Sequence, residues 1–364
     1  MANLFDELVV KDIRLKNRIV VSPMCQYSAV DGYANAWHLV TLGARAAGGA
    51  ALVIVEANAV SPEGRITLGD MGLWSDAQAE SLRPIVAFIS QQGAVPGIQL
   101  AHAGRKASAN RPWEGDNHMD ADDPGAWQPI APSAIPFGAN LPRTPKAMTL
   151  DDIRRVQADF AAAAQRALAA GFQWLELHFA HGYLGQSFFS PLANQRTDAY
   201  GGSFENRARF LVETFEAVRA VWPERLPLTV RLGAIDYHAG EQPIEDSIAL
   251  VRRLAQDGLD LIDISMGFNT PDVSGVPWKE PGFLAPIARR IKAEVGILAA
   301  TSWNIRDPLF ADSLVRDGMV DLVMIAKALL ADPHWPYHAA QALGRPRPQD
   351  VLPVQFSTWL NRFK

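Results

Sequence analysis

Two histidines and a tyrosine lie close together near the middle of the chain. His178 and His181 are three residues apart around the end of an apolar run, and Tyr183 follows two residues later. Two imidazoles at this spacing can hold one carbonyl or nitro oxygen and stabilise negative charge that develops on it during a reaction. Histidine pairs also bind zinc, but no third ligand stands at a suitable spacing, so no metal is expected. For either histidine alone, the alternative is a structural role in which the protein satisfies the hydrogen bonds of the ring.

Further polar side chains stand in other apolar runs. Gln99 lies in one such run, and Arg231 lies at the end of another. An amide and a guanidinium that converge with the histidines suit a planar, polar ligand with an anionic end better than a single small ion. A structural ion pair is the alternative for Arg231, and a structural role is the alternative for Gln99.

The elements that must position these groups are short and apolar. Near-continuous apolar runs of this length are typical of parallel strands covered on both faces. Helical patterns lie between them, most clearly over 150–170, where Thr149 and Asp152 form a capping-box pattern and Gly171 ends the helix. The eight predicted strands are 18–23, 51–57, 95–101, 172–178, 226–232, 259–265, 295–301 and 320–326.

Eight strands alternating with helices predict an α/β fold, a single (β/α)8 barrel over residues 1–364. The alternative is a doubly wound open sheet, but no GxGxxG opens a helix after the first strand. The active site of such a barrel lies at the carboxyl ends of its strands, where the polar groups above stand. Long insertions at 103–148 and 180–203 follow the third and fourth strands.

Composition narrows the possible partners. The chain has 364 residues, a net charge of −5 and no basic run, so nucleic acid and anionic membranes are not expected partners. Its one cysteine, Cys25, excludes an internal disulfide and a cluster held by several cysteines. No apolar run reaches the roughly 18 residues that span a bilayer, and the acidic N-terminus does not resemble a signal peptide. We therefore expect a cytoplasmic protein.

One long motif resembles a known family. The stretch 178–210, HFAHGYLGQSFFSPLANQRTDAYGGSFENRARF, is similar to the signature of the Old Yellow Enzyme flavoproteins. The segments 22–32, 97–107 and 111–115 resemble the branch of that family that carries a cysteine beside the flavin. The resemblance covers nearly the whole chain.

This resemblance implies an FMN-dependent ene-reductase that takes electrons from NADPH or NADH and reduces activated C=C bonds in a ping-pong cycle. Enones, nitro compounds and quinones are the expected acceptors. Tyr183 would donate the proton to the α-carbon, and Tyr27 would bind the substrate oxygen from the opposite side. Cys25 would tune the flavin and the substrate through a weak S–H contact rather than act as a nucleophile. Packing is the alternative role for both tyrosines.

The resemblance also implies a homodimer or higher homo-oligomer. Trp303 would line the substrate pocket, and Trp359 would reach an active site, either its own or that of a neighbouring subunit; core packing is the alternative. The expected flavin-binding residues are Ser22, Pro23, Met24, Cys25, Ala57, Gln99, His178, Arg231, Ser302, Trp303, Ala326 and Lys327.

The chain departs from the family in its phosphate-binding segments. The family usually ends its eighth strand with Gly-Arg, where this chain has Ala326-Lys327, and a usual glycine is missing from the turn 303–305. Lysine keeps the charge but lacks the two-pronged guanidinium, so we expect weaker flavin retention than in a Gly-Arg relative. These departures are the only support for the alternative function, a catalytically silent flavin-binding or scaffold barrel.

Overall fold

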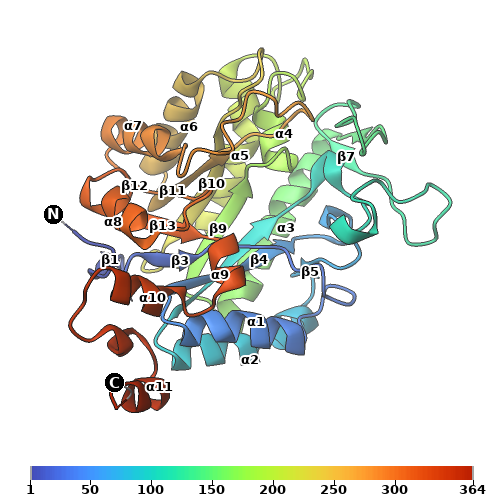
Figure 1. Cartoon of the computed structure of the whole chain (residues 1–364). Helices are drawn as coiled ribbons and strands as arrows, with labels where there is room; N and C mark the ends of the chain where they lie inside the picture. Colours follow the sequence, from blue (N-terminus) through green and yellow to red (C-terminus); the bar gives the residue numbers. More distant parts are fainter. Residues whose placement is uncertain (1, 363–364) are drawn as a thin grey trace.

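A closed barrel of eight parallel strands forms the centre of the computed structural model, which describes residues 2–362. The strands pair in the order β3-β13-β12-β11-β10-β9-β6-β4, and pairing of β3 with β4 closes the ring (Figure 1). Each of the eight predicted strands is present, so the predicted barrel is confirmed. The strands are β3 (Ile19–Val21), β4 (Leu52–Ala59), β6 (Val95–Ala101), β9 (Trp174–Phe179), β10 (Leu228–Ile235), β11 (Leu261–Met266), β12 (Leu298–Thr301) and β13 (Leu322–Ile325).

The strands form because both of their faces are covered. Every residue of β4, β6, β9 and β11 is buried, as near-continuous apolar runs require in a parallel sheet. Some polar groups of the strands pair across neighbouring strands; for example, the indole N–H of Trp174 donates to Thr229 Oγ1 at 3.1 Å.

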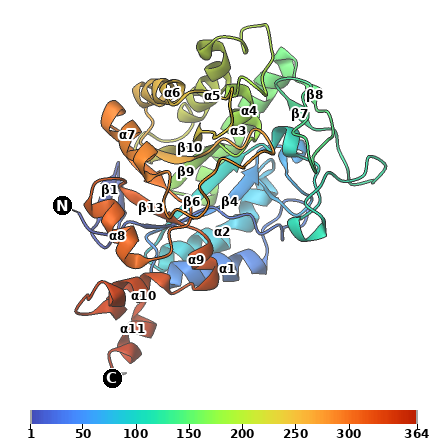
Figure 2. The same ribbon diagram turned by 45° about the horizontal axis from the view of Figure 1, so that its top comes forward.

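Helices surround the barrel in both views (Figures 1 and 2). The long helix α3 begins where the sequence predicted: Thr149 and Asp152 form the capping box, and Gly171 ends the helix at φ 100°. A left-handed residue is needed there, and glycine adopts that conformation without steric cost. The main helices are α1 (Ala36–Ala47), α2 (Asp76–Gln91), α3 (Leu150–Ala170), α5 (Phe204–Arg219), α6 (Ile244–Gln256), α7 (Ala285–Val295), α8 (Pro308–Arg316) and α10 (Trp335–Ala342).

Shorter elements lie outside this ring. A hairpin near the N-terminus joins β1 (Leu8–Val10) to β2 (Ile13–Leu15). The insertion after β6 holds the two-residue pair β7 (Ile130–Ala131) and β8 (Lys146–Ala147), while β5 (Met71–Gly72) pairs in parallel with the end of β4. The short helices are α4 (Leu184–Phe189), α9 (Lys327–Ala331) and α11 (Val354–Leu360). Among the described residues, no helix is long and apolar enough to cross a membrane.

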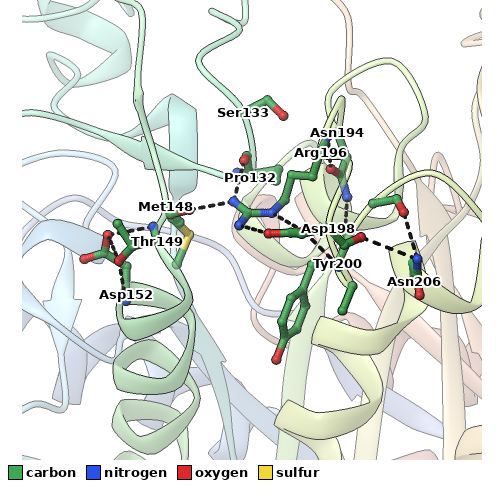
Figure 3. A network of polar contacts seen from close by, with 12 residues as sticks. Pro132, Ser133, Met148, Thr149, Asp152, Asn194, Arg196, Asp198, Tyr200 and Asn206 are labelled. Carbon is green, nitrogen blue, oxygen red and sulfur yellow. Dashed lines mark hydrogen bonds and ion pairs between the residues drawn. The ribbon is translucent and has the colours of Figure 1, made fainter.

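Arg196 joins the two long insertions to each other (Figure 3). Its guanidinium donates to the carbonyls of Pro132 at 2.9 Å and Met148 at 2.6 Å, and also pairs with Asp198 at 2.6 Å. Asn194 closes the same turn by donating to the Tyr200 carbonyl at 2.7 Å. Much of the polar motif after strand four therefore fixes the loops that frame the carboxyl ends of the strands.

Candidate functional site

Three aromatic rings meet at the carboxyl end of β9. The ring centroids of His178 and His181 are 4.8 Å apart with planes at 90°, and the Tyr183 ring is 5.1 Å from that of His178. Edge-to-face contacts at these distances hold aromatic rings in fixed relative orientations. The structure therefore brings together the three residues that the sequence singled out first.

Local hydrogen bonds fix His181. Its backbone has φ 60°, its N–H donates to the Met266 carbonyl at 3.0 Å, and its Nε2 lies 2.7 Å from Ser265 Oγ. A non-glycine residue held at positive φ next to a site is a strained position that the surrounding fold must support. His178 differs, because its buried Nδ1 has no hydrogen-bond partner among the described residues. An unpaired buried nitrogen is available to a ligand.

The three rings are uncharged at neutral pH. Burial, followed by the charge of Arg231, holds the pKa of each histidine well below its ordinary value. Burial, followed by Cys25, raises the pKa of Tyr183 well above 10. The site thus combines neutral imidazoles with a phenol that keeps its proton.

A cavity of about 410 Å³ opens beside the ring of His181. Its volume and its mixture of apolar walls and converging polar groups suit a small planar ligand. Seven residues of the predicted flavin set line it, together with His181: Ser22, Pro23, Arg231, Ser302, Trp303, Ala326 and Lys327. The lining residues that sequence reasoning missed are Trp278, Asn304, Ile305, Arg306, Met324 and Ala328.

One end of this cavity is built for an anion. Trp303 and Asn304 have φ values of 78° and 52°, so the chain turns sharply after β12. Within the part of the chain that the structure describes, the backbone N–H groups of residues 302–306 donate to no protein acceptor. Successive unpaired N–H groups in such a turn form an anion-binding nest. The cations of Arg306 and Lys327 line the same space, so these residues fit a phosphate-bearing cofactor.

Arg231 takes part in a buried ion pair and also reaches the cavity. Its Nε lies 3.1 Å from the carboxylate of Asp263, and its Nη2 donates to Ser302 Oγ at 3.0 Å. The two predicted alternatives, ligand binding and structural pairing, are therefore compatible in one side chain.

The remaining predicted flavin contacts stand on neighbouring strands. Gln99 is the register partner of Ala57 and donates to Glu176 Oε1 at 2.8 Å. Ala57 and Tyr183 both line a second, much smaller cavity of about 10 Å³. The amide oxygen of Gln99 does not take part in the Glu176 contact. Met24 follows Ser22 and Pro23 in the chain after β3.

Cys25 and Tyr27 stand in the segment after β3. Burial raises the pKa of Tyr27, and the nearby groups Cys25 and Tyr183 add to this rise. Burial also raises the pKa of the Cys25 thiol well above its ordinary value. A protonated thiol is a weak nucleophile.

Trp303 belongs to an aromatic wall along the cavity. Its ring lies 6.2 Å from that of His181, 5.6 Å from Phe268 and 5.6 Å from Trp278. Trp359 is not part of this wall, because its side chain is 68% exposed on α11. Trp359 lines a different cavity, together with His334, Tyr337 and Phe356. The structure therefore does not bring Trp359 to the site of its own chain.

Sequence reasoning also missed Lys106. Its Nζ donates to the carbonyls of His181 at 2.7 Å and Phe268 at 3.0 Å, and it lies 5.8 Å from the centroid of the Tyr183 ring. Burial, followed by the charge of Arg105, lowers the pKa of Lys106 to about 7. The only available signal was its place in the segment 97–107.

Lys106 is expected to give the site a pH dependence near neutrality. Below about pH 7 the positive charge of Lys106 stabilises negative charge on a ligand held by the histidines. This stabilisation is lost as pH rises and the Lys106 ammonium deprotonates. The histidines and Tyr183 titrate outside this window. For the enone reduction that the family resemblance implies, this predicts a rate that falls about three- to tenfold between pH 6 and 8.5.

Single-turnover rates across this pH range test the expectation. Lys106→Met should make the single-turnover rate nearly independent of pH. Lys106→Arg, which stays charged, should keep the rate high to a higher pH than in the native protein. Identical profiles for the native protein and Lys106→Met would show that Lys106 is not the titrating group.

Comparison with known proteins gives consistent matches. A model of the NADH:flavin oxidoreductase / NADH oxidase family matches residues 3–345. The NADPH dehydrogenase of Geobacillus sp. (strain WCH70) is 43% identical over 343 residues, 94% of each chain. The solved structure of morphinone reductase has a TM-score of 0.78 at 28% identity and covers 93% of this chain and 90% of its own. An old yellow enzyme homologue from Zymomonas mobilis has a TM-score of 0.76 over 95% of this chain and 94% of its own; at 24% identity this is a likeness in fold.

Proposed function

We propose, from the premise that this chain belongs to the NADH:flavin oxidoreductase / NADH oxidase family, that it is an ene-reductase for activated C=C bonds. The chain is an FMN-dependent NAD(P)H oxidoreductase of the Old Yellow Enzyme group. The proposal concerns its substrates and the roles of its residues. It depends above all on the edge-to-face cluster of His178, His181 and Tyr183 beside the cavity.

The proposed cofactor site extends along this cavity. Arg231 and Gln99 would lie at the pyrimidine edge of the flavin, where a cation and donors suit the charge that the reduced form carries. At the other end, the N–H groups after β12 and the cation of Lys327 would hold the phosphate. FMN, when bound, supplies the hydride that the alkene accepts at its β-carbon.

The chain's own side chains would bind and polarise the substrate. His178 and His181 are neutral, so each can donate one N–H to a carbonyl or nitro oxygen and stabilise the charge that develops there. Tyr183 keeps its proton at neutral pH and would deliver it to the α-carbon. Tyr27 would approach the oxygen from the other side, and Trp303 would close the pocket against water.

The substrates proposed are small electrophiles with a conjugated acceptor. Enones, nitroalkenes and quinones share an oxygen for the histidine pair and an electron-poor carbon for the hydride. The aromatic wall of Trp303, Phe268 and Trp278 favours flat, apolar molecules of this kind.

Anaerobic spectroscopy tests this function against a catalytically silent flavin-binding or scaffold barrel. The purified protein should be yellow, bleach with NADPH or NADH, and regain its colour with 2-cyclohexenone while releasing cyclohexanone. A protein that binds flavin without bleaching would be a silent barrel. If NADPH or NADH bleaches the protein but no enone, nitroalkene or quinone restores its colour, the family activity is present and the proposed substrate class is wrong.

A finer likeness rests on two segments. Cys25 after Pro-Met and the ADPHW segment (331–335) resemble the cysteine-containing branch of the family, and xenobiotic reductase A within it. In the structure Trp335 of this segment donates to the Arg306 carbonyl at 2.8 Å, so the segment supports the loop after β12. A role in reducing foreign electrophiles in the cytoplasm belongs to the same proposal.

The C-terminal tail is proposed to act between subunits. Val354, Phe356 and Trp359 on α11 are all more than two-fifths exposed, at 68%, 44% and 68%. Phe356 and Trp359 line one shared cavity, and exposed apolar side chains of this size favour burial against a second subunit. Deletion from Gln355 onward should therefore change both the oligomeric state and the steady-state kinetics. Light scattering and initial rates check this, and a truncated protein unchanged in both would refute it.

A further inference from the structure

We propose that Arg306 provides the guanidinium that binds the FMN phosphate in this protein, in place of the arginine that the family carries after its eighth strand. The inference rests on the proposed function for the placement of the phosphate. Arg306 and Lys327 line the same cavity, Arg306 from the loop after β12 and Lys327 from the start of α9, which follows β13. The cation lost at one loop is thus present on the other.

The charge of Arg306 is not used elsewhere. Among the described residues, no carboxylate pairs with its guanidinium and no protein acceptor binds it. Its neighbour Asp307 is occupied, because the Asp307 carboxylate accepts from the Leu309 N–H at 3.0 Å and caps α8. A guanidinium without a protein partner beside a cavity is available to an anion.

The backbone of Arg306 is held in place while its side chain stays exposed. The Arg306 carbonyl accepts from the buried Trp335 indole at 2.8 Å, and the preceding Ile305 is buried. The unpaired N–H groups of residues 302–306 belong to the same loop. A fork of donors and a backbone nest therefore share one segment, which is the combination that phosphate recognition requires.

Chemistry favours Arg306 over Lys327 as the main ligand. A guanidinium binds two phosphate oxygens at once in a fixed plane, whereas an ammonium acts as a point charge. The substitution of Gly-Arg by Ala326-Lys327 by itself predicts weak flavin retention. With Arg306 as the ligand, retention depends on position 306 more than on position 327.

A second cavity also contacts Arg306 and offers a competing role. It has a volume of about 610 Å³ and is lined by Trp278, Lys279 and Asn304, among others. A phosphate of the nicotinamide nucleotide could bind Arg306 from that side. The two roles differ in which ligand loses affinity when the guanidinium is removed.

Flavin titration of the apoprotein tests the proposal, with FMN and riboflavin as the two probes because riboflavin lacks only the phosphate. Arg306→Ala should weaken FMN binding about 10- to 100-fold and change riboflavin binding less than about threefold. Lys327→Ala should weaken FMN less than Arg306→Ala does, and Arg306→Lys should lie between. Lys279→Ala, which removes a nearby cation of the second cavity alone, is the matched control and should leave both affinities unchanged.

Three outcomes would overturn the proposal. These are an unchanged FMN affinity in Arg306→Ala, an equal loss for FMN and riboflavin, and a raised KM for NADPH with FMN binding intact. The thermal midpoint of each apoprotein variant shows whether it is folded, and Arg306→Lys repeats the comparison with the charge retained. A wrong proposed function would give a different result: the native protein would bind FMN tightly, but enones would not reoxidise the reduced flavin.

Discussion

Tyr183→Phe should slow the reoxidation of the reduced enzyme by an enone about 10²- to 10⁴-fold while leaving its reduction by NADPH unchanged. The phenol lies 5.1 Å, ring to ring, from His178, which is the imidazole proposed to hold the substrate oxygen. Loss of the hydroxyl removes the proposed proton donor but keeps the ring, its packing and the edge-to-face contact. The two half-reactions therefore separate a catalytic effect from a structural one.

Stopped-flow absorbance of the flavin with 2-cyclohexenone measures this effect. Tyr33→Phe is the matched control, because Tyr33 is 41% exposed and outside the ring cluster, and it should change neither half-reaction. The raised pKa of Tyr183 adds a second check. Deprotonation of this phenol cannot explain any slowing between pH 6 and 9, so such slowing should persist in Tyr183→Phe. An unchanged reoxidation rate in the variant would show that water or another group supplies the proton.

Arg231→Met is expected to have the largest effect on stability, about 3–5 kcal/mol of unfolding free energy. Arg231 and Asp263 are both buried, 5% and 0% exposed, and form an ion pair at 3.1 Å inside the barrel. Removal of the guanidinium leaves a carboxylate in the core without a cation. Breaking such a pair costs more than the pair contributes, because the remaining charge is desolvated and unpaired.

The loss of unfolding free energy in Arg231→Met should increase as pH rises. Burial already raises the pKa of Asp263 to about 6, although Arg231 acts to lower it. Without Arg231 this pKa rises further, so the folded protein holds a proton that the unfolded chain, with an ordinary pKa near 3.8, releases. Stability is then lost as pH rises through the folded pKa. Urea denaturation should show a larger deficit at pH 8 than at pH 5.

A second substitution separates the two roles of Arg231. Adding Asp263→Asn to Arg231→Met should recover most of the lost stability, because no buried charge remains. Flavin affinity should stay low in this double variant, since the cation proposed at the pyrimidine edge is still missing. If the double variant were as unstable as Arg231→Met, the ion pair would not be the cause. If it bound FMN as tightly as the native protein, Arg231 would have a structural role alone.

Local patterns in the chain were sufficient to predict the barrel and the place of the histidine pair, whereas the role of Tyr183 came from the family resemblance. Eight apolar runs of strand length, with helices between them, allow few folds other than a closed parallel barrel. Since the active site of a barrel lies at the carboxyl ends of its strands, His178 and Arg231 could be assigned to one rim without coordinates. Each of these signals depends on residues near one another in sequence, as does the capping box at Thr149 that was confirmed at the start of α3.

Only the tertiary structure decided which distant residues share that rim. Lys106 contacts the carbonyl of His181 across 75 positions of sequence, and Asp263 pairs with Arg231 from the next strand. The positive φ angles at Trp303 and Asn304 turn the chain so that Arg306 lines the cavity with Lys327. Closure of the sheet and the path of each loop set such contacts, and neither is written in the spacing of residues along one segment.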